Sequence, residues 1–274
     1  MKYIKILILL LLFGLSQSVI AADKVYTFGV VPQQAASEMA ETWLPFLSWL
    51  SDKSGIKLRF VTAPDIPTFE KRLGEGAYDF AYMNPYHYTV FHKVPGYEAL
   101  AKEMDRKLKG ILVVRKDSPI KDIKELNGAT LVFPAPAAFA ASILPRAALR
   151  KAGVAFTPKF VSSHDSVYLN VQHGLYPAGG GIVRTFDMLD EATKKELRIL
   201  WATPGYTPHV IATKPNLPKS ISKKLLDTML NMNEDPSGQE KLKLIGFKGI
   251  VAAEDSEWDD IRQLNITELD NRTE

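Results

Sequence analysis

Apolar runs alternate with amphipathic segments along most of this 274-residue chain. Residues 25–31 (VYTFGVV) predict a strand, and residues 38–55 place large apolar side chains at helical spacing before Gly55. A strand, a short helix and a third strand are predicted next, over residues 56–63, 65–76 and 78–85. This order is typical of a parallel sheet, in which functional loops follow the carboxyl ends of the strands. Those loops are residues 32–37, 63–67 and 83–88.

The same alternation continues through the middle of the chain. Residues 117–128 predict a short helix that ends at Gly128, and residues 162–174 predict a helix that starts near Ser163 or His164. Further strands are predicted over residues 129–133, 156–161, 178–183 and 198–213, and further helices over residues 139–152, 185–197 and 218–235. The pattern as a whole indicates layers of helices and sheets, an α/β fold.

An unusual segment, FPAPAAFAAS (residues 133–142), fills one predicted strand-to-helix turn. Such a turn presents free backbone N–H groups to an anion, and here those groups belong to Ala137, Ala138 and Phe139. The turn has a single hydroxyl, that of Ser142. Each hydroxyl that is lacking removes about 0.5–1.5 kcal/mol of net hydrogen bonding to an oxyanion. Phe139 is expected either to give the site an apolar wall or to pack inward against the sheet.

The first residues have the three parts of a secretory signal. Lys2 and Lys5 form the charged start, residues 6–15 the apolar core, and residues 19–21 a small-residue cleavage site. The apolar run is about ten residues long, shorter than the roughly 20 that span a bilayer. We therefore expect residues 1–21 to be a signal peptide, cleaved after Ala21 or Ala22, and the mature protein to be periplasmic.

Charge and cysteine content narrow the classes of partner. The formal net charge of the whole chain is +3, and removal of the two leader lysines brings it nearer to neutral, so no nucleic-acid partner is expected. The chain has no cysteine, which excludes disulfides, thiolate metal sites and a cysteine nucleophile. No GxSxG motif and no zinc-type histidine spacing occurs, so neither a metal, a cofactor nor a catalytic role is expected.

Five ordered motifs carry a resemblance to a known family. Residues 30–60, 73–88, 113–134, 162–183 and 204–213 together resemble the periplasmic substrate-binding proteins of phosphate, phosphite and phosphonate ABC transporters. The resemblance implies a type II periplasmic-binding-protein fold, with two α/β lobes, each a mostly parallel sheet flanked by helices. It also implies two crossover strands, here near residues 111–118 and 199–208. The first lobe would comprise residues 22–113 and 204–274, and the second residues 114–203.

The resemblance also implies where a solute would bind, between the two lobes. The candidate binding residues, most from the matching motifs and Ser142 and Arg184 from their own chemistry as the hydroxyl of the turn and the cation after the glycine run, are Gln33, Gln34, Tyr82, Asn84, Tyr86, Ala137, Ala138, Phe139, Ser142, Ser163, His164, Asp165, Arg184 and His209. The family's anion-holding turn normally carries consecutive hydroxyls. This chain has Ala135 to Ala141 there, which puts a phosphonate ligand in doubt.

Several of these residues have a second interpretation. Ser163, His164 and Asp165 have the chemistry of a helix N-cap, which needs no ligand. Tyr82 and His209 are equally consistent with core positions, and Arg184 could pair with the nearby Asp187. The three consecutive glycines at residues 179–181 let backbone approach closely either a ligand or a neighbouring helix.

The sequence therefore predicts a monomeric periplasmic protein that closes its lobes on a small polar or anionic solute and passes it to an ABC permease. Two alternatives remain at this stage. The same lobes would serve a receptor that feeds a membrane sensor protein, because both functions use the same cleft. A periplasmic hydrolase is a more remote alternative, and it predicts turnover of a phosphate or phosphonate ester.

Overall fold

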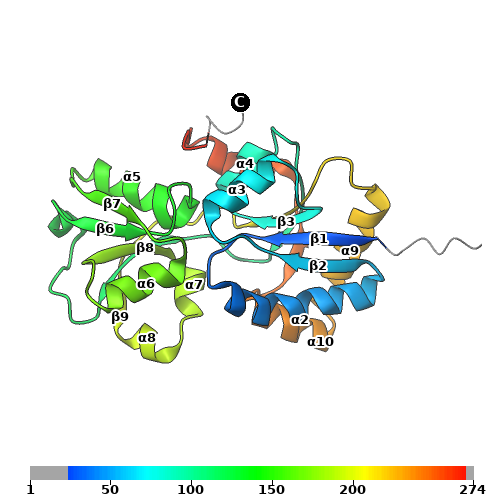
Figure 1. The fold of residues 1–274 in the computed structure, drawn as a ribbon, viewed down its shortest axis with the longest axis horizontal. Helices are drawn as coiled ribbons and strands as arrows, with labels where there is room; N and C mark the ends of the chain where they lie inside the picture. Colours follow the sequence, from blue (N-terminus) through cyan, green and yellow to red (C-terminus); the bar gives the residue numbers. More distant parts are fainter. Residues whose placement is uncertain (1–23, 270–274) are drawn as a thin grey trace, which may run out of the picture.

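Two β-sheets organise the protein in the computed structural model, which describes residues 24–269 (Figure 1). One sheet has six strands in the order β11-β4-β10-β3-β1-β2, and the other has five in the order β7-β6-β8-β5-β9. Helices flank each sheet, so the molecule has two α/β lobes side by side (Figure 1). The predicted signal peptide, residues 1–21, lies outside the described residues.

The first lobe is built from both ends of the described chain. Its strands are β1 (Val25–Val30), β2 (Lys57–Val61), β3 (Phe80–Met83), β4 (Glu98–Glu103), β10 (Val210–Thr213) and β11 (Ile250–Ala252). Its helices are α2 (Ala36–Ser54), α3 (Ile66–Gly74), α4 (Pro85–Phe91), α9 (Lys219–Asn231), α10 (Pro236–Leu244), the 3₁₀ turn η3 (Asp255–Trp258) and α11 (Asp259–Arg262).

The second lobe uses the middle of the chain. Its strands are β5 (Gly110–Arg115), β6 (Thr130–Phe133), β7 (Thr157–Phe160), β8 (Ala178–Ile182) and β9 (Leu197–Ala202). Its helical segments are the 3₁₀ turn η1 (Ile123–Leu126), the π-helical turn η2 (Phe139–Ile143), α5 (Leu144–Lys151), α6 (His164–Gln172), α7 (Val183–Asp187) and α8 (Glu191–Lys195). No helix within residues 24–269 is long and apolar enough to cross a bilayer.

The sheets are mixed rather than mostly parallel. In the first lobe β1 pairs in parallel with β2 and β3, as the sequence pattern predicts, and in the second lobe β6 pairs in parallel with β7 and β8. The remaining pairs are antiparallel, because β10 returns from the other lobe to lie between β3 and β4, and β5 enters the second lobe beside β8 and β9. The expectation of mostly parallel sheets therefore holds only for the strand-helix-strand halves.

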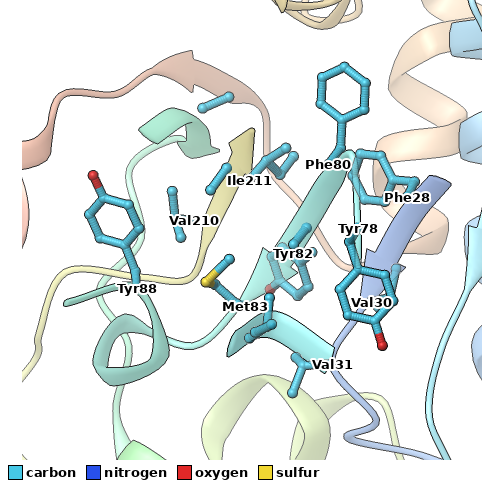
Figure 2. Packing of buried hydrophobic residues seen from close by; sticks show 14 of the residues in the cluster. Phe28, Val30, Val31, Tyr78, Phe80, Tyr82, Met83, Tyr88, Val210 and Ile211 are labelled. Atoms are coloured by element: carbon cyan, nitrogen blue, oxygen red, sulfur yellow. The ribbon is translucent and has the colours of Figure 1, made fainter. Parts of the chain in front are cut away.

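The first lobe has an aromatic core beneath its sheet. The rings of Phe28 on β1 and Phe80 on β3 stack with their centroids 6.2 Å apart, and Trp43 of α2 packs 4.9 Å from Tyr82. Figure 2 shows these strand side chains gathered with those of β10. This packing fixes the carboxyl ends of β1 and β3, where the predicted functional loops begin.

Two short segments connect the lobes. Residues 104–109 join β4 to β5, and residues 203–209 join β9 to β10. They are held together by two backbone hydrogen bonds between Leu108 and Tyr206, of 2.8 and 2.9 Å. The first crossing thus precedes its predicted place near residues 111–118, and the predicted boundary after residue 113 falls inside β5. The reason is that the whole apolar run of β5 pairs within the second lobe.

Three local predictions also need correction. The turn predicted after β3 is the helix α4, which Asn84 caps by accepting from the His87 backbone N–H at 2.8 Å and which Pro85 begins. The helix predicted over residues 185–197 is two short helices, α7 and α8. The interrupted strand predicted over residues 198–213 is β9 and β10, which belong to different sheets.

Candidate functional site

Gln33, in the loop after β1, is the residue on which the two lobes converge. It is buried, and its backbone oxygen accepts a hydrogen bond of 2.8 Å from the backbone N–H of His164, the first residue of α6. Its side-chain nitrogen lies 3.0 Å from Nε2 of His209, and its side-chain oxygen accepts from Arg184 of α7. One glutamine therefore links β1, α6, α7 and the second crossing segment.

The orientation of the Gln33 amide follows from these partners. A guanidinium can only donate, so Arg184 must face the amide oxygen. The amide nitrogen then faces His209, whose Nε2 accepts, and this places the imidazole proton on Nδ1. Arg184 also donates to the Ile245 carbonyl at 3.3 Å and lies over the Tyr82 ring, 5.6 Å from its centroid.

The two histidines beside Gln33 are neutral at physiological pH. Burial, together with the nearby Arg184 charge, lowers the pKa of His164 to about 3. Burial and the same arginine hold the pKa of His209 well below its usual value of 6.5. His164 Nδ1 is paired with the Thr185 hydroxyl at 2.9 Å. Both imidazoles are therefore hydrogen-bonding groups rather than charges.

The alanine-rich turn is the second wall of the site, and glycines position it. A Cβ on Gly110 would lie 1.9 Å from the Ala140 carbonyl oxygen, and a Cβ on Gly180 would lie 2.0 Å from that of Ala141. The turn therefore sits directly on β5 and β8, at a distance that only glycine permits. Gly179 similarly lets the Val167 side chain of α6 pack closely against β8. Of the two alternatives for the glycine run, a close approach of neighbouring backbone and helix is the one observed.

The start of this turn presents unused backbone donors. Within residues 24–269, the N–H groups of Phe139, Ala140 and Ala141 donate no hydrogen bond to another protein atom. They begin a helical segment that runs on into α5, so they carry the partial positive charge of a helix N-terminus. An oxyanion at this point would accept from them without any hydroxyl.

A small cavity lies between Gln33 and the turn. It is lined by Val31, Gln33, Ile66, Asn84, Ala138, Phe139, Ala140, Ala141, His164, Ile182 and His209. Its volume is about 10 Å³, and a single water needs about that much. Because residues of both lobes line it, a larger molecule can enter only when the walls separate.

Most of the predicted site residues lie at or beside this cavity. Gln33, Asn84, Ala138, Phe139, His164 and His209 line it. The Ala137 carbonyl accepts from the Asn84 amide at 3.4 Å across the two lobes. Tyr82 and Arg184 line a separate pocket with His209. We call it the hinge-side pocket, because Leu108 and Pro208 of the two connecting segments also line it. Phe139 combines its two predicted roles, since it lines the cavity and also packs edge-on against Tyr206, with ring centroids 5.6 Å apart.

The other predicted residues have different positions. The Ser142 hydroxyl faces Arg146 at 3.0 Å within the second lobe, and the Tyr86 hydroxyl accepts from the Leu269 backbone at 2.8 Å. Neither side chain lines the cavity. Ser163 caps α6 by accepting from the Ser166 N–H at 3.1 Å, as its N-cap chemistry predicts.

Gln34 and Asp165 line a separate acidic groove at the cleft mouth. It has a volume of about 390 Å³ and includes Glu38 and Glu41 of α2 and Asp190 of the second lobe. Asp165 accepts a hydrogen bond of 2.9 Å from the Ala35 N–H across the lobes. Burial, together with the adjacent Glu38 carboxyl, raises the pKa of Asp165 to about 7. No cluster of three or more metal-ligating His, Asp or Glu side chains occurs within residues 24–269.

Sequence reasoning missed several residues of the site. Ala140 and Ala141 line the cavity and belong to the turn that the sequence singled out. Their position follows from the close packing of their carbonyl oxygens against Gly110 and Gly180. Thr185, which holds His164, gave no signal in the sequence. The apolar lining residues Val31, Ile66 and Ile182 gave none either, because apolar residues at element ends look like core.

Comparison with known proteins identifies the family of this chain. Residues 28–258 match the family model described as "ABC transporter, phosphonate, periplasmic substrate-binding protein". The chain belongs to this family. Among curated members, the phosphonates-binding periplasmic protein of Escherichia coli is 23% identical over 89% of this chain and 77% of its own length. The phosphate-import protein PhnD of Mycolicibacterium smegmatis is 22% identical over 87% and 84%.

Solved structures share the two-lobe fold of this family. The binding component of an ABC phosphonate transporter from Pseudomonas aeruginosa superposes with a TM-score of 0.82 at 18% identity, over 92% of this chain and 88% of that one. PhnD1 from Prochlorococcus marinus, solved with methylphosphonate, gives a TM-score of 0.79 at 21% identity, over 89% and 99%. The predicted type II periplasmic-binding-protein fold is thus confirmed.

Proposed function

We propose that this periplasmic substrate-binding protein captures a small oxyanion in the cavity between Gln33 and the turn at residues 139–141. The observation that carries this proposal is that three residues with unused backbone N–H groups line a cavity that Gln33 lines from the other lobe. Helix N-termini with free N–H groups bind anions readily. The phosphonate and phosphate relatives support the oxyanion class.

Closure of the lobes is the step that creates the site. Four hydrogen bonds already join loop 33–35 or Asn84 to the second lobe: those from His164 N–H to the Gln33 backbone, from Arg184 to the Gln33 side chain, from Ala35 N–H to Asp165, and from Asn84 to Ala137. Because the cavity of the described state has room for about one water, the walls must stand further apart around a solute. A solute that contacts both walls binds a closed form better than an open one, so it shifts the population toward closure. The closed complex would then dock on an ABC permease and release its solute there.

A thermal-shift screen tests this function. We expect methylphosphonate, phosphite or another small oxyanion to raise the melting temperature, because a ligand at 100 times its Kd stabilises the protein by about 2.7 kcal/mol. The variant Gln33→Leu should lose this shift. The matched control Gln34→Leu, at the adjacent residue outside the cavity, should keep it. Absence of a shift with every oxyanion, or an equal loss in both variants, would remove the proposed site.

A further inference from the structure

The cavity between Gln33 and the alanine-rich turn is lined without any charged side chain, as far as residues 24–269 show. Its polar side chains are those of Gln33, Asn84, His164 and His209. The amides are neutral. Both imidazoles are buried, and Nε2 of His209 faces the donating Gln33 amide nitrogen, so that ring nitrogen carries no proton. The positive charge that reaches the cavity is indirect, since Arg184 contacts it through the Gln33 oxygen.

The charges immediately behind this wall nearly cancel. Arg106 lines the same pocket as Arg184, but its charge is paired with Glu103 at 3.3 Å and with Asp187 at 3.7 Å. Glu103 is buried and also lies in the field of Arg184. The two other cations of the hinge-side pocket, Lys107 and Lys109, are exposed to solvent, which screens them. The surroundings thus offer little net positive charge beyond the helix N-terminus.

The rest of the lining is apolar and has no hydroxyl. Seven of the eleven lining residues are apolar, among them Val31, Ile66, Phe139 and Ile182, and none is serine or threonine. A group that enters this space loses its hydration. Only the backbone donors at residues 139–141, the Gln33 and Asn84 amides and the imidazoles replace it. One negative charge is compatible with that set, whereas a second would be buried without a compensating cation.

Resting on the proposed oxyanion function, we infer that the solute of this protein is a singly charged oxyanion with a small apolar substituent, and not a dianion such as phosphate or sulfate. The charged oxygens would meet the N–H groups of the turn. The apolar substituent would meet the wall formed by Phe139, Ile66 and Val31. Alkylsulfonates and the monoanions of alkylphosphonates both have this chemistry.

A series of matched tetrahedral sulfur compounds tests the inference by isothermal titration calorimetry. Dimethyl sulfone, methanesulfonate and sulfate have similar shape and carry zero, one and two negative charges. We expect methanesulfonate to bind at least tenfold more tightly than either of the others. Sulfate binding as tightly as methanesulfonate would overturn the inference, and so would preferential binding of the neutral sulfone.

Methylphosphonate separates the effect of charge from that of the protein's own titration, because it loses its second proton near neutral pH and methanesulfonate does not. The Kd for methylphosphonate divided by the Kd for methanesulfonate should rise at least tenfold between pH 5.5 and pH 8.5. A constant ratio would contradict a preference for monoanions. Binding of phosphate alone would overturn the inference while leaving the proposed function intact, whereas binding of no oxyanion at all would remove both.

A gain-of-function variant gives an independent readout. Ala140→Ser adds a hydroxyl at the turn, and we expect it to improve sulfate affinity relative to methanesulfonate by severalfold. The control Ala147→Ser makes the same change at an exposed position of α5 and should leave the ratio unchanged. No change in the ratio with Ala140→Ser would show that missing hydroxyls do not set the charge preference.

Discussion

Arg184 of the second lobe donates a hydrogen bond to the side-chain oxygen of Gln33 in the first lobe. Both residues are buried, so this charge-assisted bond is formed away from water. It orients the Gln33 amide and, through it, the imidazole of His209. Because the bond joins residues of the two lobes, we expect it to break when the lobes separate.

Replacing Arg184 with methionine keeps much of the apolar stem but removes this donor. We expect Arg184→Met to raise the Kd for methylphosphonate about 10- to 100-fold, since a hydrogen bond to a charged group contributes about 1.5–3 kcal/mol. The control Arg198→Met removes an arginine that binds the Ser118 and Ile120 carbonyls within the second lobe, and it should keep normal affinity. Calorimetry makes the comparison, and equal affinity in Arg184→Met and the native protein would contradict the role of Arg184.

Asp165 makes stability depend on pH. Its pKa is raised from 3.8 to about 7, so between these values the native protein keeps a proton that the unfolded chain releases. Stability therefore falls as pH rises from about 4 to 7 and then levels off. We expect Asp165→Asn, whose side-chain oxygen can still accept from Ala35, to be more stable at pH 8.5 by about 1–2 kcal/mol, or about 2–4 °C in melting temperature.

The matched control for this prediction is Glu41→Gln, which removes a charge from the same groove. The groups facing Asp165 are Glu38 on α2, with Glu41 on the same helix, and Asp190 from the second lobe, together with the neutral His164 beside it. Melting curves at pH 5.5 and 8.5 should show the pH-dependent gain in Asp165→Asn only. An equal gain in Glu41→Gln would mean that general acidity of the groove, not the Asp165 and Glu38 pair, sets the effect.

The buried imidazoles have an opposite dependence on pH. Because the pKa of His164 lies near 3 in the native protein, the unfolded chain binds a proton below about pH 6.5 that the native chain does not. This difference in proton binding lowers the free energy of unfolding as pH falls below 6.5. Nuclear magnetic resonance should find the ring signals of His164 and His209 unchanged between pH 8 and 5. Titration of either ring in that interval would show that the site carries a positive charge near neutral pH.

The alanine-rich turn depends on Gly180. Gly180→Ala would bring a Cβ to 2.0 Å from the Ala141 carbonyl, so the turn must move. We expect a loss of about 1–3 kcal/mol in the free energy of unfolding, measured with urea, together with weaker solute binding. Gly74→Ala serves as control, because its Cβ would meet only Phe91 at an ordinary 3.6 Å. Normal stability and binding in Gly180→Ala would contradict the close seating of the turn.

The sequence predicted the parts of the fold that depend on local pattern. The strand-helix-strand order of β1 to β3 and the start of α6 at Ser163 are confirmed, because periodicity and capping act over a few residues. It did not predict the helix α4, since the Asn84 and Pro85 pair that begins this helix is also typical of a turn. Nor did it locate the first crossing, because the polar segment before β5 does not show in which sheet that strand pairs.

The site was predicted in outline, and its details depend on contacts between distant segments. Gln33 hydrogen-bonds to His209, which is 176 positions away in the sequence, and also to the backbone of the distant His164. Ser142 instead contacts Arg146, four residues on in the same helical segment, and Tyr86 accepts from Leu269, a partner 183 positions away that no local pattern identifies. The position of Arg184 behind Gln33 likewise follows from tertiary packing.

The most direct test of the account is a crystal structure of the protein grown with methylphosphonate at pH 5.5. We expect the oxyanion between the lobes, with its oxygens within hydrogen-bonding distance of the N–H groups of residues 139–141 and of the Gln33 amide, and its methyl group against Phe139. A methylphosphonate found bound outside this cavity, or touching one lobe only, would contradict the account.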